Sequence, residues 1–224
     1  MRHLLALVVV LAVPALAHAG GSVTGKVTVT ETDGKAAQGA EVIVYVVGPP
    51  ADAPGAPAAP SKKVQIEQKG RRFVPDLVAI TINDEVEFPN RDSFLHNVFS
   101  QSPGRKFDLG SYKKGESKSR AFSQAGVIDV YCNIHPEMAA TILVLPNRWH
   151  TRAKADGTFT LDNIPAGNWT VFAYTRRATK PASAKVTVAD KSATTVNLSV
   201  TRGAEAEHLN KYGSKYSGDG GTYR

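Results

Sequence analysis

The chain of 224 residues contains one cysteine and two methionines, and only 8% of its residues are aromatic. A single cysteine excludes a disulfide scaffold, a zinc ribbon, a cysteine-ligated iron–sulfur cluster and a two-cysteine redox motif. The apolar fraction of 42% is ordinary, which argues against a membrane bundle and against a disordered acidic chain. The formal net charge of +7 permits anionic partners but selects none of them.

The first residues have the layout of a secretory signal peptide. Arg2 gives a positive start, Leu4–Leu16 is apolar, and Ala17-His18-Ala19 offers small residues before Gly20. The apolar run is shorter than the about 20 residues needed to span a bilayer, and no cysteine near Gly20 could carry a lipid. We therefore expect residues 1–19 to be cleaved, the protein to be periplasmic or extracellular, and no stable membrane insertion.

Short apolar–polar alternations separated by turn signals fill the rest of the chain, and no convincing amphipathic helix appears. This pattern predicts an all-β protein built from β-sandwiches. A proline- and alanine-rich tract predicts a linker over residues 51–60. Residues 203–224 are rich in glycine, serine, lysine and tyrosine, with nothing to bury, and predict a disordered tail.

One stretch carries the residues of a metal site. Cys132, His135 and Met138 follow one another at three-residue spacing, and His96 begins an upstream strand pattern. A thiolate, two imidazoles and a thioether are the ligand set of a blue-copper electron-transfer site. Zinc fits poorly, because its structural sites use cysteine, histidine or carboxylate rather than a thioether.

Each of these residues also has an ordinary interpretation. A lone cysteine is usually a small buried hydrophobe, a lone methionine usually fills a core, and a histidine beside a proline usually belongs to a turn. Their joint occurrence at ligand spacing favours the metal site. His150 and His208 have no partner at ligand spacing, so we expect both to be surface residues.

At these residues the sequence resembles the cupredoxin family, with the short ligand loop most similar to amicyanin and its relatives. The likeness extends over roughly Lys62–Leu145 and indicates a domain over residues 61–146. It rests on these motifs: Phe73-Val74-Pro75, Asn83-Asp84-Glu85-Val86, Phe88-Pro89-Asn90-Arg91-Asp92, Gly126 and Tyr131–Met138.

The resemblance implies a Greek-key β-sandwich that carries one copper ion, cycling between Cu(I) and Cu(II). It implies the metal ligands His96, Cys132, His135 and Met138. It also implies that the backbone N–H of Asn97 bonds to the cysteine sulfur, and that Pro136 removes a further N–H donor near it.

The flanking segments resemble a carboxypeptidase regulatory-like domain, which is a transthyretin-like β-sandwich. The opening hairpin pattern lies in residues 20–50, and the remaining pattern lies in residues 150–201. We expect one discontinuous, smaller sandwich in which the cupredoxin is inserted or which it adjoins. The alternative is a continuous C-terminal domain, with residues 20–50 pairing onto the cupredoxin sheet.

The expected function is that of a secreted or periplasmic single-electron carrier. Its expected partners are redox proteins, such as a dehydrogenase donor and a c-type cytochrome acceptor. The alternatives are a copper storage or delivery protein, and a surface-binding β-protein with a vestigial metal loop. We expect no enzymatic activity, because no nucleophile–base pair is evident, and no nucleic-acid partner.

Overall fold

A computed structural model describes residues 20–60 and 62–216. Within these ranges the chain forms eighteen strands and no helix, so the all-β prediction is confirmed. No described helix could cross a membrane. The predicted signal peptide, residues 1–19, and the last part of the predicted tail, residues 217–224, lie outside the described residues.

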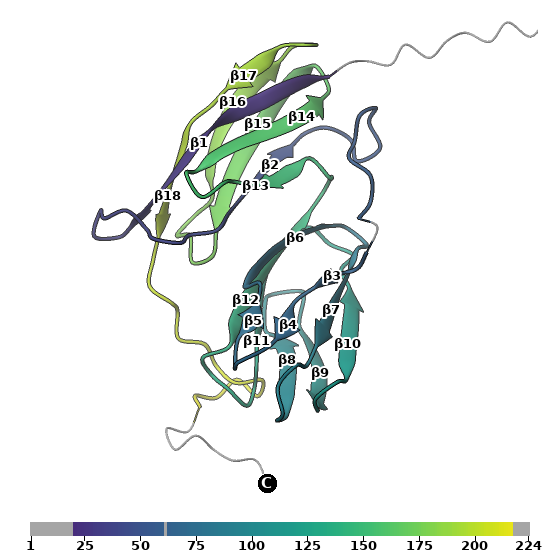
Figure 1. The fold of residues 1–224 in the computed structure, drawn as a ribbon, viewed down its shortest axis with the longest axis vertical. Helices are drawn as coiled ribbons and strands as arrows, with labels where there is room; N and C mark the ends of the chain where they lie inside the picture. Colours follow the sequence, from purple (N-terminus) through teal and green to yellow (C-terminus); the bar gives the residue numbers. More distant parts are fainter. Residues whose placement is uncertain (1–19, 61, 217–224) are drawn as a thin grey trace, which may run out of the picture.

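Strands β3 to β12 form one body, the lower one in Figure 1, which we call the central sandwich. One sheet has the order β10-β7-β3, formed by Ser117–Ala121, Glu85–Pro89 and Val64–Gln65. The facing sheet has the order β6-β12-β11-β8-β9, formed by Leu77–Thr81, Ala139–Leu145, Gly126–Tyr131, His96–Ser100 and Phe107–Tyr112. A small pair, β4 and β5, joins Glu67–Gln68 to Phe73–Val74.

The remaining strands form a second body, the terminal sandwich, at the top of Figure 1. In one sheet β1 lies between β14 and β17 and also pairs with β18, and the strands are Gly21–Glu31, Thr158–Ile164, Ala193–Thr195 and Leu198–Arg202. The other sheet has the order β13-β2-β15-β16, formed by His150–Arg152, Val42–Val47, Gly167–Thr175 and Ala182–Val188. Both N-terminal strands therefore pair with strands that lie beyond residue 150.

Local sequence explains the turns that shape these sheets. Asn83 adopts a φ of 72°, a conformation that asparagine tolerates better than most residues, and Asp84 closes the β6–β7 turn with a backbone bond to Thr81. Gly48 follows β2 with a φ of 135°, and an added Cβ there would lie 2.2 Å from the Trp169 ring. The tryptophan therefore packs directly on the backbone at this position.

Strand β12 is buried on both faces, which explains its almost unbroken apolar sequence. Ala140, Ile142 and Val144 pack into the core of the central sandwich. Leu143 and Leu145 point the other way and pack with Ile43 and Tyr174 of the terminal sandwich. The two sandwiches thus share an apolar contact built around β12.

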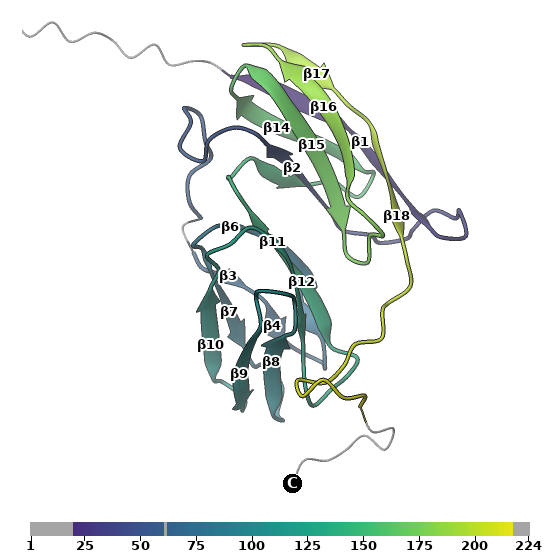
Figure 2. The same cartoon turned by 180° about the vertical axis from the view of Figure 1, so that it is seen from behind.

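Residues 203–216, the described part of the predicted tail, make hydrogen bonds to the central sandwich. This segment runs from the end of β18 down beside the central sandwich, as the yellow trace in Figures 1 and 2 shows. It has no apolar run that would predict order. Its polar and aromatic groups instead bond to groups that the folded central sandwich presents, including Gln101 and Asp108.

Candidate metal centre

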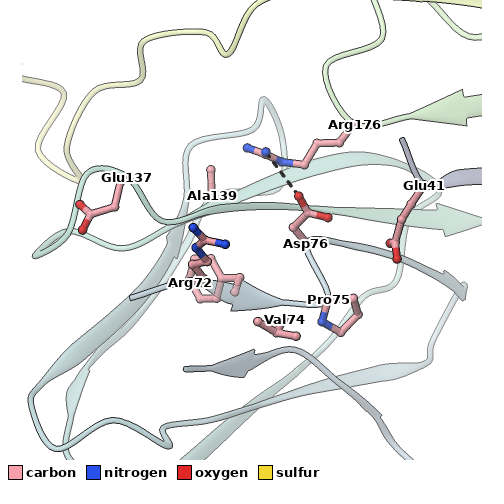
Figure 3. A pocket seen from close by; sticks show the side chains of 9 residues that line it. Glu41, Arg72, Val74, Pro75, Asp76, Glu137, Ala139 and Arg176 are labelled. Atoms are coloured by element: carbon pink, nitrogen blue, oxygen red, sulfur yellow. Dashed lines mark ion pairs between the residues drawn. The ribbon is translucent and has the colours of Figure 1, made fainter. Parts of the chain in front are cut away.

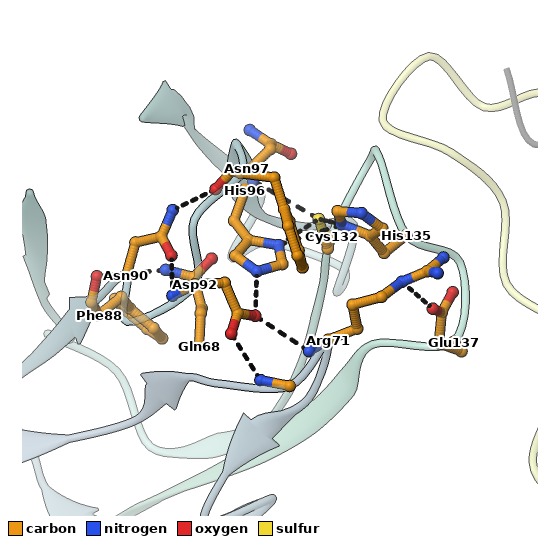
Figure 4. A network of polar contacts seen from close by, with 12 residues as sticks. Gln68, Arg71, Phe88, Asn90, Asp92, His96, Asn97, Cys132, His135 and Glu137 are labelled. Atoms are coloured by element: carbon orange, nitrogen blue, oxygen red, sulfur yellow. Dashed lines mark hydrogen bonds and ion pairs between the residues drawn. The ribbon is translucent and has the colours of Figure 1, made fainter. Parts of the chain in front are cut away.

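Three of the four predicted ligands meet at one end of the central sandwich (Figure 4). Cys132 Sγ lies 3.8 Å from His96 Nδ1 and 3.7 Å from His135 Nδ1. The two Nδ1 atoms are 3.1 Å apart. All three donor atoms lie within 4.8 Å of one another, which makes the cluster able to hold a metal ion.

The separations fit a shared ion. Metal bonds of about 2.0 Å to imidazole nitrogen and about 2.3 Å to thiolate sulfur limit two donors on one ion to about 4.0 Å (N–N) and about 4.3 Å (S–N). The observed distances of 3.1, 3.7 and 3.8 Å all fall below these limits. The three side chains can therefore bind one ion with little movement.

Strand pairing brings these residues together. β11 and β12 are antiparallel partners up to Tyr131 and Ala139, so the residues between them form a short connecting loop. We call residues 132–138 the ligand loop. Inside it, the Cys132 N–H donates to the Met138 carbonyl at 3.3 Å, and the Met138 N–H donates to the His135 carbonyl at 3.0 Å. β8 lies beside β11 in the same sheet and brings His96 to the loop.

Met138 is fully buried and belongs to the same apolar cluster as Cys132. Its backbone bonds close the ligand loop, so the residue has a structural role whether or not its sulfur binds metal. Its assignment as an axial ligand remains a prediction.

The cluster is enclosed and its ionisable groups favour neutral forms. His96 and Cys132 are completely buried, while His135 is partly exposed. Burial lowers the pKa of His96, and burial together with the neighbouring His96 lowers the pKa of His135. Burial also raises the pKa of the Cys132 thiol, although backbone N–H groups, that of Asn97 among them, oppose this shift. The imidazoles therefore keep free lone pairs, and a bound metal must displace the thiol proton.

Asp92 orients the first histidine. Its Oδ2 lies 2.8 Å from His96 Nε2, and the same carboxylate accepts the N–H groups of Gly70 at 2.7 Å and Arg71 at 3.0 Å. Burial raises the pKa of Asp92, but these three donors outweigh it and leave the pKa below its usual value. A carboxylate on Nε2 assigns the proton to that nitrogen and directs the lone pair of Nδ1 toward the other donors.

Sequence analysis did not assign a role to Asp92. The available signal was its position four residues before His96, in a segment already attributed to the family resemblance. The two side chains meet only because the loop ahead of β8 folds back. Asn90 holds this loop in its folded-back path. It is fully buried, and its side-chain amide donates to the carbonyls of Phe94 at 2.9 Å and Tyr112 at 3.0 Å.

The residue after the first histidine lies where the resemblance implies. The Asn97 N–H donates to Cys132 Sγ at 3.5 Å. Its side-chain oxygen accepts the Asn133 N–H at 3.3 Å, and its side-chain nitrogen donates to Asp108 at 2.7 Å. Asn97 therefore links the sulfur, the ligand loop and β9. Pro136 is exposed, and its carbonyl accepts a bond from the His208 ring.

The two remaining described histidines are apart from the donor cluster. His150 lies in β13 and is half-buried, and burial lowers its pKa. His208 is also half-buried, against the ligand loop, rather than on an open surface. Both residues are thus partly covered rather than fully exposed, and the ring of Tyr131 covers one face of His208.

A charged cavity of about 460 Å³ lies where the two sandwiches meet (Figure 3). Its walls carry Arg72 and Glu137 from the central sandwich, and Glu41 and Arg176 from the terminal sandwich. Asp76 lies 3.6 Å from Arg176 across it. The cavity includes none of the three clustered donors, so it is separate from the metal centre.

Comparison with known proteins gave matches among solved structures. A methionine-to-alanine mutant of amicyanin with Cu(I) is 18% identical, over 46% of this chain and 98% of that one, with a TM-score of 0.36. A purple cupredoxin from Nitrosopumilus maritimus is 23% identical, over 37% of this chain and all of that one, with a TM-score of 0.34. A copper-containing nitrite reductase from Thermus scotoductus is 26% identical, over 41% of this chain and 24% of that one, with a TM-score of 0.36.

No family model and no curated protein matches the chain. At the TM-scores above, the structural matches say nothing about the chemistry of the site, which follows from the side chains themselves. The resemblance of the terminal sandwich to carboxypeptidase regulatory-like domains remains a prediction.

Proposed function

We propose that this chain is a type 1, or blue, copper protein that carries one electron at a time between redox partners. The observation that supports this most strongly is the triangle of His96 Nδ1, Cys132 Sγ and His135 Nδ1 around one metal-sized space. Two imidazoles and one thiolate, with a distant thioether as fourth ligand, are the donor set of blue-copper centres. Copper held by such a set supplies reversible one-electron oxidation and reduction.

The surroundings of the donors favour electron transfer because they are rigid. Asp92 fixes the ring of His96, and Asn97 bonds to both the sulfur and the ligand loop. His96 and Cys132 have no exposed surface. When side chains are held by their own packing and hydrogen bonds, little has to move as the charge of a bound ion changes. Complete burial of these two ligands also supports a carrier rather than an enzyme, since a substrate would need access to the ion.

His135 provides a route for electrons to reach a partner. It is the partly exposed member of the donor set, and its ring lies 5.2 Å from that of Phe94. Phe94 and Leu95 are 41% and 50% exposed, and Pro136, the residue after His135, is also exposed. An apolar patch of this kind suits brief docking of a redox protein, such as a dehydrogenase or a c-type cytochrome. Because residues 1–19 have the pattern of a signal peptide, we expect these encounters in the periplasm or outside the cell.

Voltammetry of the full chain loaded with copper tests this proposal. We expect a reversible one-electron wave in the wild type and in His150→Gln, which alters a histidine of the terminal sandwich. His135→Ala should lose the wave. A wild-type protein that gives no reversible wave, yet passes its copper readily to a chelator, would contradict electron transfer and favour copper delivery.

A further inference from the structure

The C-terminal segment contacts the ligand loop along its length. His208 stacks on Tyr131, the residue before the cysteine, with ring centroids 3.8 Å apart and an interplanar angle of 17°. The Nε2 of His208 also donates to the Pro136 carbonyl at 2.8 Å. The His208 side chain thus contacts the chain on both sides of the turn, at Tyr131 and at Pro136.

Two further residues of the segment bond to the loop between these points. The Tyr216 hydroxyl donates to the Cys132 carbonyl at 3.0 Å. The Lys211 N–H donates to the side-chain oxygen of Asn133 at 2.9 Å. With the segment in place Cys132 and Asn133 are buried, so it supplies hydrogen-bond partners to groups that have little contact with water.

The segment is itself anchored to the central sandwich. Gln101 donates to the Lys211 carbonyl at 2.7 Å, and the Lys211 ammonium lies 2.7 Å from Asp108. Asn210 is 9% exposed, and its side-chain oxygen accepts the N–H groups of Tyr212 at 2.9 Å and Ser214 at 3.1 Å. These bonds fix the position of the C-terminal segment independently of the ligand loop. The segment can therefore restrict how the loop moves.

We propose that residues 203–216 form a C-terminal clamp that positions the metal-binding loop, with His208, Lys211 and Tyr216 as positioning residues. The clamp bonds to the loop backbone and to the Asn133 side chain and stacks on the Tyr131 ring, and these contacts leave the donor atoms free. The loop is also tied to the central sandwich by the ion pair between Arg71 and Glu137 at 2.8 Å. Only the identity of the ion rests on the proposed function, because the clamp contacts are made within the chain itself.

Amide hydrogen exchange on the metal-free full chain tests the clamp directly. Tyr216→Phe removes one hydroxyl, and Tyr45→Phe is a matched control because Tyr45 lies in β2 of the terminal sandwich, outside the clamp. Loss of one internal hydrogen bond should speed exchange at the amides of Asn133 and Met138 about fivefold in Tyr216→Phe. The control should exchange at the wild-type rate. Exchange at the wild-type rate in both Tyr216→Phe and Tyr45→Phe would overturn the clamp.

A second variant and a second signal separate positioning from general stability. His208→Ala should also speed exchange in the ligand loop, and His208→Phe, which keeps an aromatic ring on Tyr131, should recover part of the protection. In copper-loaded protein, His208→Ala should shift the wavelength of the thiolate-to-copper absorption and release copper to EDTA several-fold faster. Unchanged exchange, wavelength and release in His208→Ala would overturn the proposal. A wild type that binds no copper would contradict the proposed function, while the exchange data would still decide on the clamp.

Discussion

The two sandwiches differ in what they bury. The terminal sandwich has a core of valine, leucine, phenylalanine and tryptophan, with Trp149 and Val171 completely or almost completely enclosed. The central sandwich has a similar apolar core but also buries Gln68, Asn90 and His96. Burying polar groups costs free energy unless each is hydrogen-bonded. Asn90 and His96 have side-chain partners, whereas the side-chain oxygen of Gln68 has none among the described residues. The terminal sandwich also buries Asn147 and Thr175, but only the central sandwich buries a histidine beside a cysteine.

The largest effects are expected from cavities in the two cores. Trp149→Ala in the terminal sandwich and Phe88→Ala in the central sandwich should each reduce the free energy of unfolding by about 3–5 kcal/mol. Only Phe88→Ala should also weaken copper retention, because Phe88 belongs to the same apolar cluster as Cys132 and Met138. Circular dichroism would follow overall unfolding, and the visible absorption would follow the copper site. Loss of copper from folded Trp149→Ala at room temperature would show that the two bodies act as one unit.

A smaller effect is expected from the carboxylate behind His96. Asp92→Asn keeps the size of the side chain but removes the charge that orients the ring, and should weaken copper binding about 10–100-fold. Asp76→Asn is the matched control, since Asp76 lines the cavity between the sandwiches instead. Competition with a chelator of known affinity measures the copper affinity of both variants. If Asp92→Asn bound copper within twofold of the wild-type affinity, Asp92 would not contribute to copper binding.

Loss of the Asp84–Arg148 ion pair should lower the free energy of unfolding by about 1–2 kcal/mol, in a pH-dependent way. This is less than the usual value for charged hydrogen bonds because both side chains are partly exposed. Burial raises the pKa of Asp84, but the bonds from Arg148 and the Thr81 N–H outweigh it and hold the pKa below 3.8. The stabilisation is therefore present above pH about 4 and is lost as the pH falls through the lower, folded-state pKa.

Urea unfolding of Asp84→Asn and of the wild type at several pH values checks this prediction. The variant should be less stable at pH 7, and the two curves should converge in acid. A gap that stays constant with pH would mean that Asp84 stabilises the turn by its shape and not by its charge.

The smallest effect is expected at the exposed pair of Arg71 and Glu137. The two side chains are 55% and 48% exposed, so Arg71→Gln should cost at most about 1 kcal/mol of stability. The difference should shrink at high salt because screening weakens exposed charge pairs. Thermal melting of Arg71→Gln and the wild type at low and high ionic strength measures this difference. A large loss of stability that salt leaves unchanged would indicate that Arg71 stabilises the protein by packing and not by its ion pair.

The sequence predicts much of the central sandwich because its information is local. Alternation identifies the strands, and Cys132, His135 and Met138 reveal the ligand loop by their spacing. His96 can be added because few histidines compete for the role.

Asp92 and the C-terminal clamp could not be predicted in the same way. The role of Asp92 depends on the backbone N–H groups of Gly70 and Arg71, which lie more than twenty residues away. His208 and Tyr216 order a polar segment by bonding to a surface that exists only after the sheets have formed. Composition describes what a segment can bury, but it does not describe which bonding groups a distant element presents to it.

Titration of the metal-free full chain with Cu(II), followed by visible absorption, tests the central claim most directly. The His96–Cys132–His135 cluster predicts an intense blue colour that saturates at one equivalent of copper, and a colourless Cys132→Ser variant. A wild-type protein that stays colourless with copper bound would contradict the account, and so would an equally blue Cys132→Ser variant.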